Sequence, residues 1–370
     1  MPPLSIMIKP VSGMCDLRCR YCFYADVSAH REKASFGRMR EETAHALIRR
    51  AFMYADDSVT FAFQGGEPTL AGIDFYERFV SLVREYNTRG LRVAYSLQTN
   101  GCGLTDAFCA FFAKHDFLVG VSLDGTREMH NAARVDAAGE GSYDRVICGI
   151  RLLQKHKVEC NILCVVTEAV AKAPKAVWQA LAPYGYIQFI PCIDAFDGGT
   201  SAFSLSAKSY GEFLIAVYDL YEAAFLRGSP VSERRFDNYL SMLLGQMPEH
   251  CGMAGQCGLY FLVEADGGVY PCDFYVLDAW RSGNICETSF VRLAKTEQMT
   301  AFRQESLQKP PACRDCTWFR LCRGGCRRDR EQILGEPLGE NRFCESYRML
   351  FAARGARMAA LADKVAKIYK

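Results

Sequence analysis

Residues 10–24 read PVSGMCDLRCRYCFY, and this stretch places Cys15, Cys19 and Cys22 in one short loop with the spacing C-x3-C-x2-C. Four thiolates saturate a cubane iron–sulfur cluster, whereas three leave one iron open to bind another molecule. Aromatic side chains around Cys22 would shield such a cluster from water. The spacing therefore predicts a reactive cluster, although taken alone it also fits a zinc knuckle or three unrelated thiols.

A second group of cysteines lies in the last third of the chain, so that eleven of the eighteen cysteines fall into two spaced sets. Eight thiolates would hold two closed four-iron clusters. Zinc is the alternative here, because the pairs C-x2-C and C-x3-C resemble zinc-ribbon spacing. A disulfide framework suits short secreted chains, and this chain is long enough to build a core without one. The eight members are Cys251, Cys257, Cys272, Cys313, Cys316, Cys322, Cys326 and Cys344.

The composition is that of a well-cored protein with no bulk electrostatic field. The chain has 370 residues, is 50% hydrophobic and carries a net charge of +2 from 44 basic and 42 acidic side chains. Such a balance gives no reason to expect nucleic acid or a membrane surface as a partner. The start, MPPLSIMIKP, lacks a basic segment followed by a long apolar run, and no apolar stretch is long enough to cross a bilayer. We expect a cytoplasmic protein.

Short β-rich runs alternate with helical patterns over residues 1–235, which predicts a parallel sheet with helices outside it. Six such units predict an α/β fold, a partial (β/α)6 TIM-like barrel rather than the closed eightfold one. The expected strands are residues 4–9, 59–64, 92–98, 117–123, 158–167 and 186–191. The expected helices are residues 41–54, 75–86, 106–114, 143–155, 176–182 and 207–226.

Polar and glycine-rich motifs follow the expected strand ends. They read QGGEP at 64–68, QTNG at 98–101 and SLDG at 122–125. In parallel α/β barrels this rim carries the chemistry. Gly65 and Gly66 would allow close backbone approach to a ligand, and Glu67 adds a carboxylate that can accept from an ammonium group. For Asn100 and Ser122 the alternative is a turn-forming side chain that bonds its own backbone.

Residues 236–370 form a second expected domain, which is loop-rich and held together by metal. The residues around 264–272 predict a small hairpin that ends at Cys272. A final amphipathic helix over residues 346–368 is expected to pack against the barrel. Residues 197–206 have the composition of a flexible loop.

The cysteine loop followed by the Gly-Gly-Glu turn resembles the radical S-adenosylmethionine (SAM) superfamily over residues 4–230. In that superfamily a [4Fe–4S] cluster cleaves SAM to a 5′-deoxyadenosyl radical, which removes hydrogen from an unactivated C–H bond. The resemblance implies that Cys15, Cys19 and Cys22 hold the cluster. It also implies a set of SAM contacts: Tyr24, Gln64, Gly65, Gly66, Glu67, Asn100 and Ser122.

The C-terminal cysteine pattern resembles the SPASM extension of peptide-modifying radical SAM enzymes, which binds two auxiliary [4Fe–4S] clusters. By this resemblance one auxiliary cluster is held by Cys251, Cys257, Cys272 and Cys326. The other is held by Cys313, Cys316, Cys322 and Cys344. With the SAM-binding cluster, the expected total is three.

Nearly end to end, the chain resembles the anaerobic sulfatase-maturating enzymes, through FAFQGGEPTLAG at 61–72, SLQTNG at 96–101 and VYPCDFYVLD at 269–278. The resemblance implies oxidation of one Cys or Ser of a sulfatase to Cα-formylglycine. It implies that Asp273 acts as the base, and like charge from a neighbouring cluster would raise the pKa of this carboxyl. The alternative for Asp273 is a side chain that caps its turn.

The expected partners are a sulfatase polypeptide bearing Cys/Ser-x-Pro-x-Arg and an electron donor such as flavodoxin or ferredoxin, and we expect a monomer. Two other interpretations stay open. One is another SPASM-type peptide maturase that forms thioether or carbon–carbon crosslinks, although the early cysteine loop leaves no room for the N-terminal recognition domain common there. The other is a non-enzymatic iron–sulfur carrier or zinc-stabilised binding module, which has no use for an open-site cluster.

Overall fold

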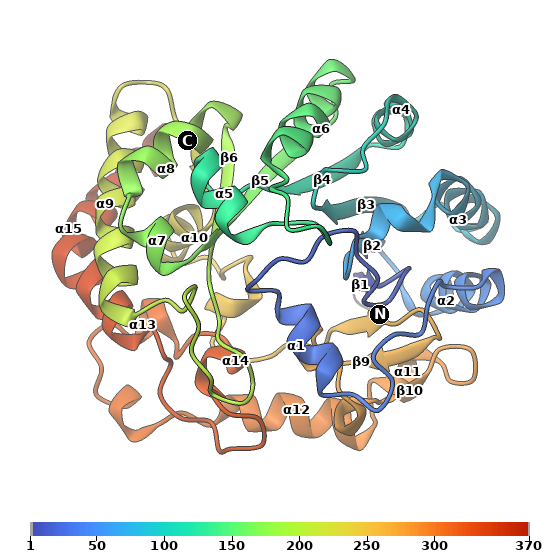
Figure 1. The fold of residues 1–370 in the computed structure, drawn as a ribbon. Helices are drawn as coiled ribbons and strands as arrows, with labels where there is room; N and C mark the ends of the chain where they lie inside the picture. Colours follow the sequence, from blue (N-terminus) through green and yellow to red (C-terminus); the bar gives the residue numbers. More distant parts are fainter. Residues whose placement is uncertain (1–2, 369–370) are drawn as a thin grey trace. The chain divides into compact units, whose positions relative to one another are not determined.

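The computed structural model describes residues 3–368, which Figure 1 traces as a ribbon. Contacts within the chain divide it into two compact units, and each unit gathers several segments. Unit 1 takes the residues up to 122 together with 134–160 and 259–302. Unit 2 takes residues 123–133, 161–258 and those from 303 onward. The domain boundary at residue 235 stays a prediction.

Unit 1 is built on a sheet whose central strands are parallel, as the alternating pattern predicts. Neighbouring strands run β1 (Leu4–Ile8), β2 (Ser58–Phe63), β3 (Arg92–Thr99) and β4 (Phe117–Ser122). On the other side of β1 lie β8 (Phe261–Val263), β9 (Gly268–Tyr270) and β10 (Gly283–Asn284). The predicted hairpin is confirmed, because β8 and β9 are antiparallel.

The helices of unit 1 follow the strands closely. Helices α2 (Glu41–Tyr54), α4 (Asp106–Lys114) and α6 (Tyr143–Lys155) have the predicted bounds, and α3 (Ile73–Tyr86) begins two residues earlier than predicted. Each buries one apolar stripe, such as Leu47, Ile48 and Ala51 in α2. The sequence pattern did not predict α1 (Phe23–Ala29), which directly follows the third cysteine of the loop.

Unit 2 carries β5 (Cys160–Val166) from its second residue onward, together with β6 (Tyr186–Pro191) and β7 (Ser232–Glu233), all parallel. Its main helices are α5 (Arg127–Ala133), α7 (Glu168–Ala171), α8 (Pro174–Leu181), α9 (Ala207–Leu226), α10 (Arg234–Leu243) and α15 (Cys344–Ile368). The last helix packs along α9, as expected, and residues 197–206 contain no helix or strand. Within residues 3–368, no helix is both long and apolar enough to cross a membrane.

Candidate active site and cluster sites

The strand register of unit 1 brings three polar residues to one edge of the sheet. Ile8 pairs with Phe63 on one side and with Val263 on the other, so the residue that follows each strand end emerges at the same level. These residues are Lys9, Gln64 and Glu264. Backbone bonds continue the ladder there, since Lys9 N donates to Val263 O at 2.9 Å and Gln64 N to Ile8 O at 2.9 Å. The candidate site is built at this edge.

The loop that carries Cys15, Cys19 and Cys22 leaves β1 and ends at α1, with Cys22 as the residue that precedes the helix. It is pinned from two sides. Glu67 N donates to Met14 O at 2.8 Å, and Arg18 N donates to Val135 O at 2.6 Å. The backbone of the loop is therefore fixed by the protein itself.

The thiols of this loop fit a metal-ligand role. Burial raises the pKa of Cys15 to about 12, and the negative charge of Cys19 contributes a smaller part of that shift. A thiolate at this place therefore needs a cation beside it, which a cluster iron would supply. Among residues 3–368, no three His, Cys, Asp or Glu side chains gather around a point suited to one metal ion. A cubane takes one thiolate at each iron, so its ligands need not meet at one point.

The two glycines after Gln64 are required by the protein's own packing. Gly66 has φ +54°, and a Cβ there would lie 2.1 Å from Met14 O. Gly65 has φ +89°, and its Cβ would lie 2.4 Å from Lys9 Cε. The turn therefore lets the cysteine loop and the Lys9 side chain approach it closely.

Glu67 is buried and its carboxylate is fully engaged by protein donors. Its Oε1 accepts from Thr69 N at 3.0 Å, Thr69 Oγ1 at 2.7 Å and Thr99 Oγ1 at 2.8 Å. Its Oε2 accepts from Asn100 N at 2.7 Å. Burial raises the pKa of this carboxyl, and these donors oppose the rise. Glu67 thus joins the ends of β2 and β3; its contact with SAM stays a prediction.

Asn100 and Ser122 lie at the ends of neighbouring strands, as predicted. Asn100 Nδ2 donates to Asp16 Oδ1 at 2.6 Å, and Asn100 Oδ1 accepts from Cys102 N at 2.8 Å. The amide oxygen of Asn100 therefore forms a turn, as in the alternative interpretation, while its amide nitrogen binds Asp16 of the cysteine loop. Ser122 is the last residue of β4 and is buried. Their contacts with SAM are untested.

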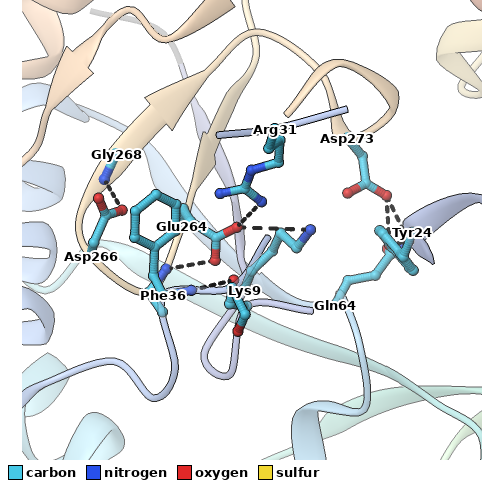
Figure 2. A network of polar contacts seen from close by, with 12 residues as sticks. Lys9, Tyr24, Arg31, Phe36, Gln64, Glu264, Asp266, Gly268 and Asp273 are labelled. Atoms are coloured by element: carbon cyan, nitrogen blue, oxygen red, sulfur yellow. Dashed lines mark hydrogen bonds and ion pairs between the residues drawn. The ribbon is translucent and has the colours of Figure 1, made fainter. Parts of the chain in front are cut away.

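A hydrogen-bonded trio links the start of α1, the end of β2 and the residue after Cys272 (Figure 2). Tyr24 Oη donates to Asp273 Oδ2 at 2.6 Å, and Gln64 Nε2 donates to Tyr24 Oη at 2.8 Å and to Asp273 Oδ2 at 3.2 Å. Asp273 Oδ1 is buried and has no hydrogen-bond partner within the described part of the chain. One carboxylate oxygen is thus held by two protein donors and the other has none.

The environment of Asp273 raises its pKa, in the predicted direction but for a different leading reason. Burial is the largest cause, whereas the Lys9 ammonium and the Tyr24 hydroxyl lower the pKa. A carboxyl with a raised pKa is a better proton acceptor. The sequence argument relied on like charge from a neighbouring cluster, and it did not foresee the burial.

Seven of the eight C-terminal cysteines lie in unit 2, where they form two groups. Cys313, Cys316, Cys322 and Cys344 line one cavity of about 290 Å³. Burial is the first cause that raises the pKa of Cys322 to about 11, and the charges of the other three also raise it. Four thiols around one cavity fit a closed four-iron cluster.

The other group consists of Cys251, Cys257 and Cys326. Burial is the largest cause that raises the pKa of Cys326, and the charges of Cys251 and Cys257 are among the smaller ones. Cys257 N donates to Ser306 Oγ at 2.8 Å, which fixes the backbone at this thiol. The fourth expected ligand, Cys272, belongs to unit 1. Its membership of this set stays a prediction, as do the other ligand assignments.

Sequence reasoning missed a buried charged group beside the trio. Lys9 Nζ lies 3.9 Å from Glu264 Oε2, and Arg31 Nη1 lies 3.0 Å from the same oxygen. The signal that would have found two of them is a charged residue directly after a buried apolar strand: Lys9 follows LSIMI and Glu264 follows FLV. Arg31 offers no such signal.

Comparison with known proteins identifies the class first. Residues 10–169 match the model of the radical SAM superfamily, and residues 251–317 match the model of the iron–sulfur cluster-binding domain called SPASM. The chain is a radical SAM enzyme with a SPASM region, and the cofactor class is therefore SAM with a SAM-binding [4Fe–4S] cluster and auxiliary clusters. The zinc and disulfide alternatives are not supported.

The similar proteins narrow the class to one family. The cysteine-type anaerobic sulfatase-maturating enzyme of Clostridium novyi is 42% identical over 99% of both chains. The serine-type enzyme of Bacteroides thetaiotaomicron is 31% identical over 94% of this chain and 89% of its own. A solved structure, native anSMEcpe with bound AdoMet and Cp18Cys peptide, has a TM-score of 0.94 at 41% identity and covers 98% of this chain and 100% of its own.

The chain belongs to the anaerobic sulfatase-maturating enzymes, which convert a cysteine or serine of a sulfatase to formylglycine. The predicted fold class, an α/β partial barrel with a C-terminal SPASM region, is confirmed by the same structural match. The predictions of a radical SAM oxidoreductase and of a sulfatase peptide as substrate are confirmed with it.

Proposed function

We propose that this chain is a cysteine-type maturase, which oxidises the cysteine of a Cys-x-Pro-x-Arg segment in a sulfatase to Cα-formylglycine. The observation that carries the proposal is the difference in identity between the two kinds of relative. The cysteine-type enzyme of Clostridium novyi is 42% identical over nearly the whole chain, and the serine-type enzyme of Bacteroides thetaiotaomicron is 31% identical. The thioether and carbon–carbon crosslinking alternatives have no comparable support.

When bound, SAM and its cluster supply a radical that removes one hydrogen atom from the substrate Cβ, and the auxiliary clusters supply an acceptor for one electron. The proposed contacts of SAM with this chain are those of the cysteine loop and the strand ends. They are Tyr24, Gln64, Gly65, Gly66, Glu67, Asn100 and Ser122. The fixed backbone of the cysteine loop and the buried strand ends support this assignment.

Asp273 is the proposed base. Converting a cysteine side chain to a thioaldehyde removes one hydrogen atom, one proton and one electron, and water then replaces sulfur and releases sulfide. The free Oδ1 of Asp273 would accept the proton. Tyr24 and Gln64 hold the other oxygen, Oδ2, and so fix the orientation of the carboxylate. The raised pKa of the buried carboxyl suits this role.

The oligomeric state, the cellular location and the electron donor stay predictions. We expect the enzyme to act as a monomer, to work in the cytoplasm and to receive electrons from a flavodoxin or a ferredoxin. Each has its own test: sedimentation of the holoenzyme, fractionation of the source cells, and turnover with a reduced donor in place of a chemical reductant. A dimer, a secreted protein or a donor of another class would contradict the corresponding expectation.

The test of the activity is mass spectrometry of an anaerobic reaction. It contains iron–sulfur-reconstituted enzyme, SAM, a reductant and paired peptides with Cys-x-Pro-x-Arg or Ser-x-Pro-x-Arg. We expect aldehyde from the cysteine peptide, with 5′-deoxyadenosine formed in proportion. Aldehyde from the serine peptide alone would contradict the cysteine-type assignment. SAM cleavage without change in either peptide would contradict the sulfatase substrate.

The role of Asp273 is tested with Asp273→Asn, and Asp278→Asn serves as the matched control. Asp278 is an exposed carboxylate five residues further along the same segment. We expect Asp273→Asn to keep forming 5′-deoxyadenosine while formylglycine falls by about 100-fold or more, the scale typical of a lost general base. Asp278→Asn should behave as the wild type. Unchanged formylglycine in Asp273→Asn would overturn the assignment.

A further inference from the structure

Three buried charged side chains, Lys9, Arg31 and Glu264, lie beside the trio formed by Tyr24, Gln64 and Asp273, and together with Asp273 they make a network of four charges (Figure 2). Lys9 and Glu264 are 1% and 0% exposed, and Arg31 and Asp273 are also buried. Two cations and two carboxylates balance one another, as a buried group of charges requires. All four lie in unit 1.

Glu264 does not need Lys9 as its counter-charge. Arg31 Nη1 donates to Glu264 Oε2 at 3.0 Å, and Ala265 N donates to Glu264 Oε1 at 2.9 Å. Lys9 Nζ is the more distant cation, at 3.9 Å from Oε2. Apart from Glu264 and the Asp273 carboxylate, whose pKa it lowers, the ammonium group of Lys9 has a third neighbour.

That neighbour is the ring of Tyr24. Lys9 Nζ lies 4.6 Å from the centroid of this ring, within the range of a cation–π contact. The path of the lysine side chain is set by the turn beside it, since a Cβ on Gly65 would lie 2.7 Å from Lys9 Cγ and 2.4 Å from Lys9 Cε. The absence of a side chain at Gly65 thus leaves room for Lys9 to reach the ring.

We propose that Lys9 is a positioning residue for the oxidation: its buried ammonium holds the Tyr24 ring so that the phenol keeps its bond to Asp273 Oδ2 and Oδ1 stays without a protein donor, able to accept a proton. Tyr24 Oη is 2.6 Å from Asp273 Oδ2, so a rotation of the ring would break this bond and leave Oδ2 with only the longer, 3.2 Å bond from Gln64 Nε2. A desolvated cation–π contact of this kind is among the stronger ones. The inference rests on the proposed role of Asp273.

The test compares Lys9→Met with Lys33→Met in the reconstituted holoenzyme. Lys33 is a matched control, because its Nζ also lies over an aromatic ring, 5.0 Å from the centroid of Phe36, but it is exposed and outside the network. The first readout is formylglycine per 5′-deoxyadenosine. The second is the affinity for SAM, measured by titration calorimetry, together with iron content.

We expect Lys9→Met to lower the formylglycine yield per 5′-deoxyadenosine by about tenfold with iron content unchanged, and to change SAM affinity by no more than Tyr24→Phe does. Lys33→Met should leave all three values unchanged. If Lys9 acts through the phenol, Lys9→Met in a Tyr24→Phe background should add little to the loss that Tyr24→Phe causes alone. Effects that multiply would show that Lys9 acts by another route and would overturn the proposal.

Lys9→Gln guards against a folding defect, because glutamine keeps polarity while removing the charge. If both variants lose iron content, Lys9 is a folding residue and the proposal is overturned. Unchanged yield per 5′-deoxyadenosine in both variants overturns it as well. A failure of the proposed role of Asp273 can be told apart from a failure of this proposal. A wild-type formylglycine yield in Asp273→Asn would show that Asp273 is not the base. The comparison of the Lys9→Met and Tyr24→Phe single variants with the double variant would still show whether Lys9 acts through Tyr24.

Discussion

Replacing Gly66 by alanine should misplace the cysteine loop, and the structure allows the size of the effect to be estimated. A Cβ at Gly66 would lie 2.1 Å from Met14 O and 2.9 Å from Met14 C. Carbon–oxygen contacts are ordinarily about 3.3 Å or longer, so the backbone at Met14 would have to move by roughly 1 Å. Because Met14 directly precedes Cys15, this movement reaches the first thiol of the loop.

Gly72 provides the matched control. It also has a positive φ, +85°, although its ψ of 156° places it in a region that essentially only glycine adopts, and nothing lies within 4 Å of its Cβ position. Both substitutions therefore carry a conformational cost, which is about 1–2 kcal/mol at Gly66 and about 1–3 kcal/mol at Gly72. Gly66→Ala adds steric overlap and strains the bond from Glu67 N to Met14 O at 2.8 Å, for a further loss of about 2–4 kcal/mol.

The assay is 5′-deoxyadenosine formation by reconstituted enzyme, with iron content and SAM affinity measured on the same preparations. A displacement of about 1 Å in a positioned group commonly lowers the rate by about 100-fold. We expect that loss for Gly66→Ala, and a change of no more than about threefold for Gly72→Ala. Equal behaviour of the two variants would refute the reasoning, since it would mean that the contact with Met14 does not constrain the loop.

Three further predictions concern buried or paired charges. Glu67→Gln should lower the free energy of unfolding by about 2–4 kcal/mol. The amide oxygen can take the place of only one carboxylate oxygen, and the amide nitrogen, which cannot accept, would face the remaining donor, such as Asn100 N. Thermal unfolding beside Thr69→Val, which removes one donor hydroxyl, measures the loss, and equal losses in the two variants would contradict the prediction. Burial raises the pKa of Glu233 from 4.5 to about 7, so the folded state binds its proton more tightly and stability falls as pH rises through this window. Urea unfolding at pH 5 and pH 8 should show a loss about 2.5 kcal/mol larger in the wild type than in Glu233→Gln, and parallel pH profiles would count against the prediction. Arg354→Ala breaks two 2.7 Å bonds to Asp219 between α15 and α9 and should cost about 1 kcal/mol at low salt and less at high salt; a loss that does not depend on salt would point to packing instead.

The helices and parallel strands were predictable because their periodicity matches their burial. Helix α2, for example, has the predicted bounds of residues 41–54, and it buries Leu47, Ile48 and Ala51 on one face. Strand β2 alternates buried and half-buried residues along its whole length. In each case the local pattern and the tertiary environment agree, so the sequence alone is sufficient.

The grouping of the cysteines came from a resemblance, and the structure supplies a physical reason for part of it. Four of the expected ligands line one cavity although the first and the last are more than thirty positions apart. No periodicity predicts that Cys344, at the start of α15, lies beside the thiols of residues 313–322. The position of Cys344 depends on the path by which the chain comes back to residues 313–322, and the packing of the whole unit determines that path.

The contacts of Asp273 could not be read from the sequence for the same reason. Tyr24 and Asp273 are separated by 249 positions, and neither stands in a long periodic element. The contact between them depends on the pairing of β8 with β1. Strand β8 has only three residues and belongs to a hairpin, and no residue propensity specifies its register. A short strand has too few alternating positions to identify its partner.

The residues of the Gly-Gly-Glu turn have structural roles that the sequence argument did not assign to them. The sequence argument gave its glycines to ligand approach and its carboxylate to an ammonium group. In the structure, the space at Gly65 is filled by Lys9, the space at Gly66 by the carbonyl of Met14, and Glu67 accepts from four protein donors. Each residue of the turn therefore already has a structural task within the protein. A substitution here would disturb the cysteine loop, the lysine and the strand ends together. Loss of SAM binding in such a variant is consequently weak support for direct contact, unless iron content is preserved.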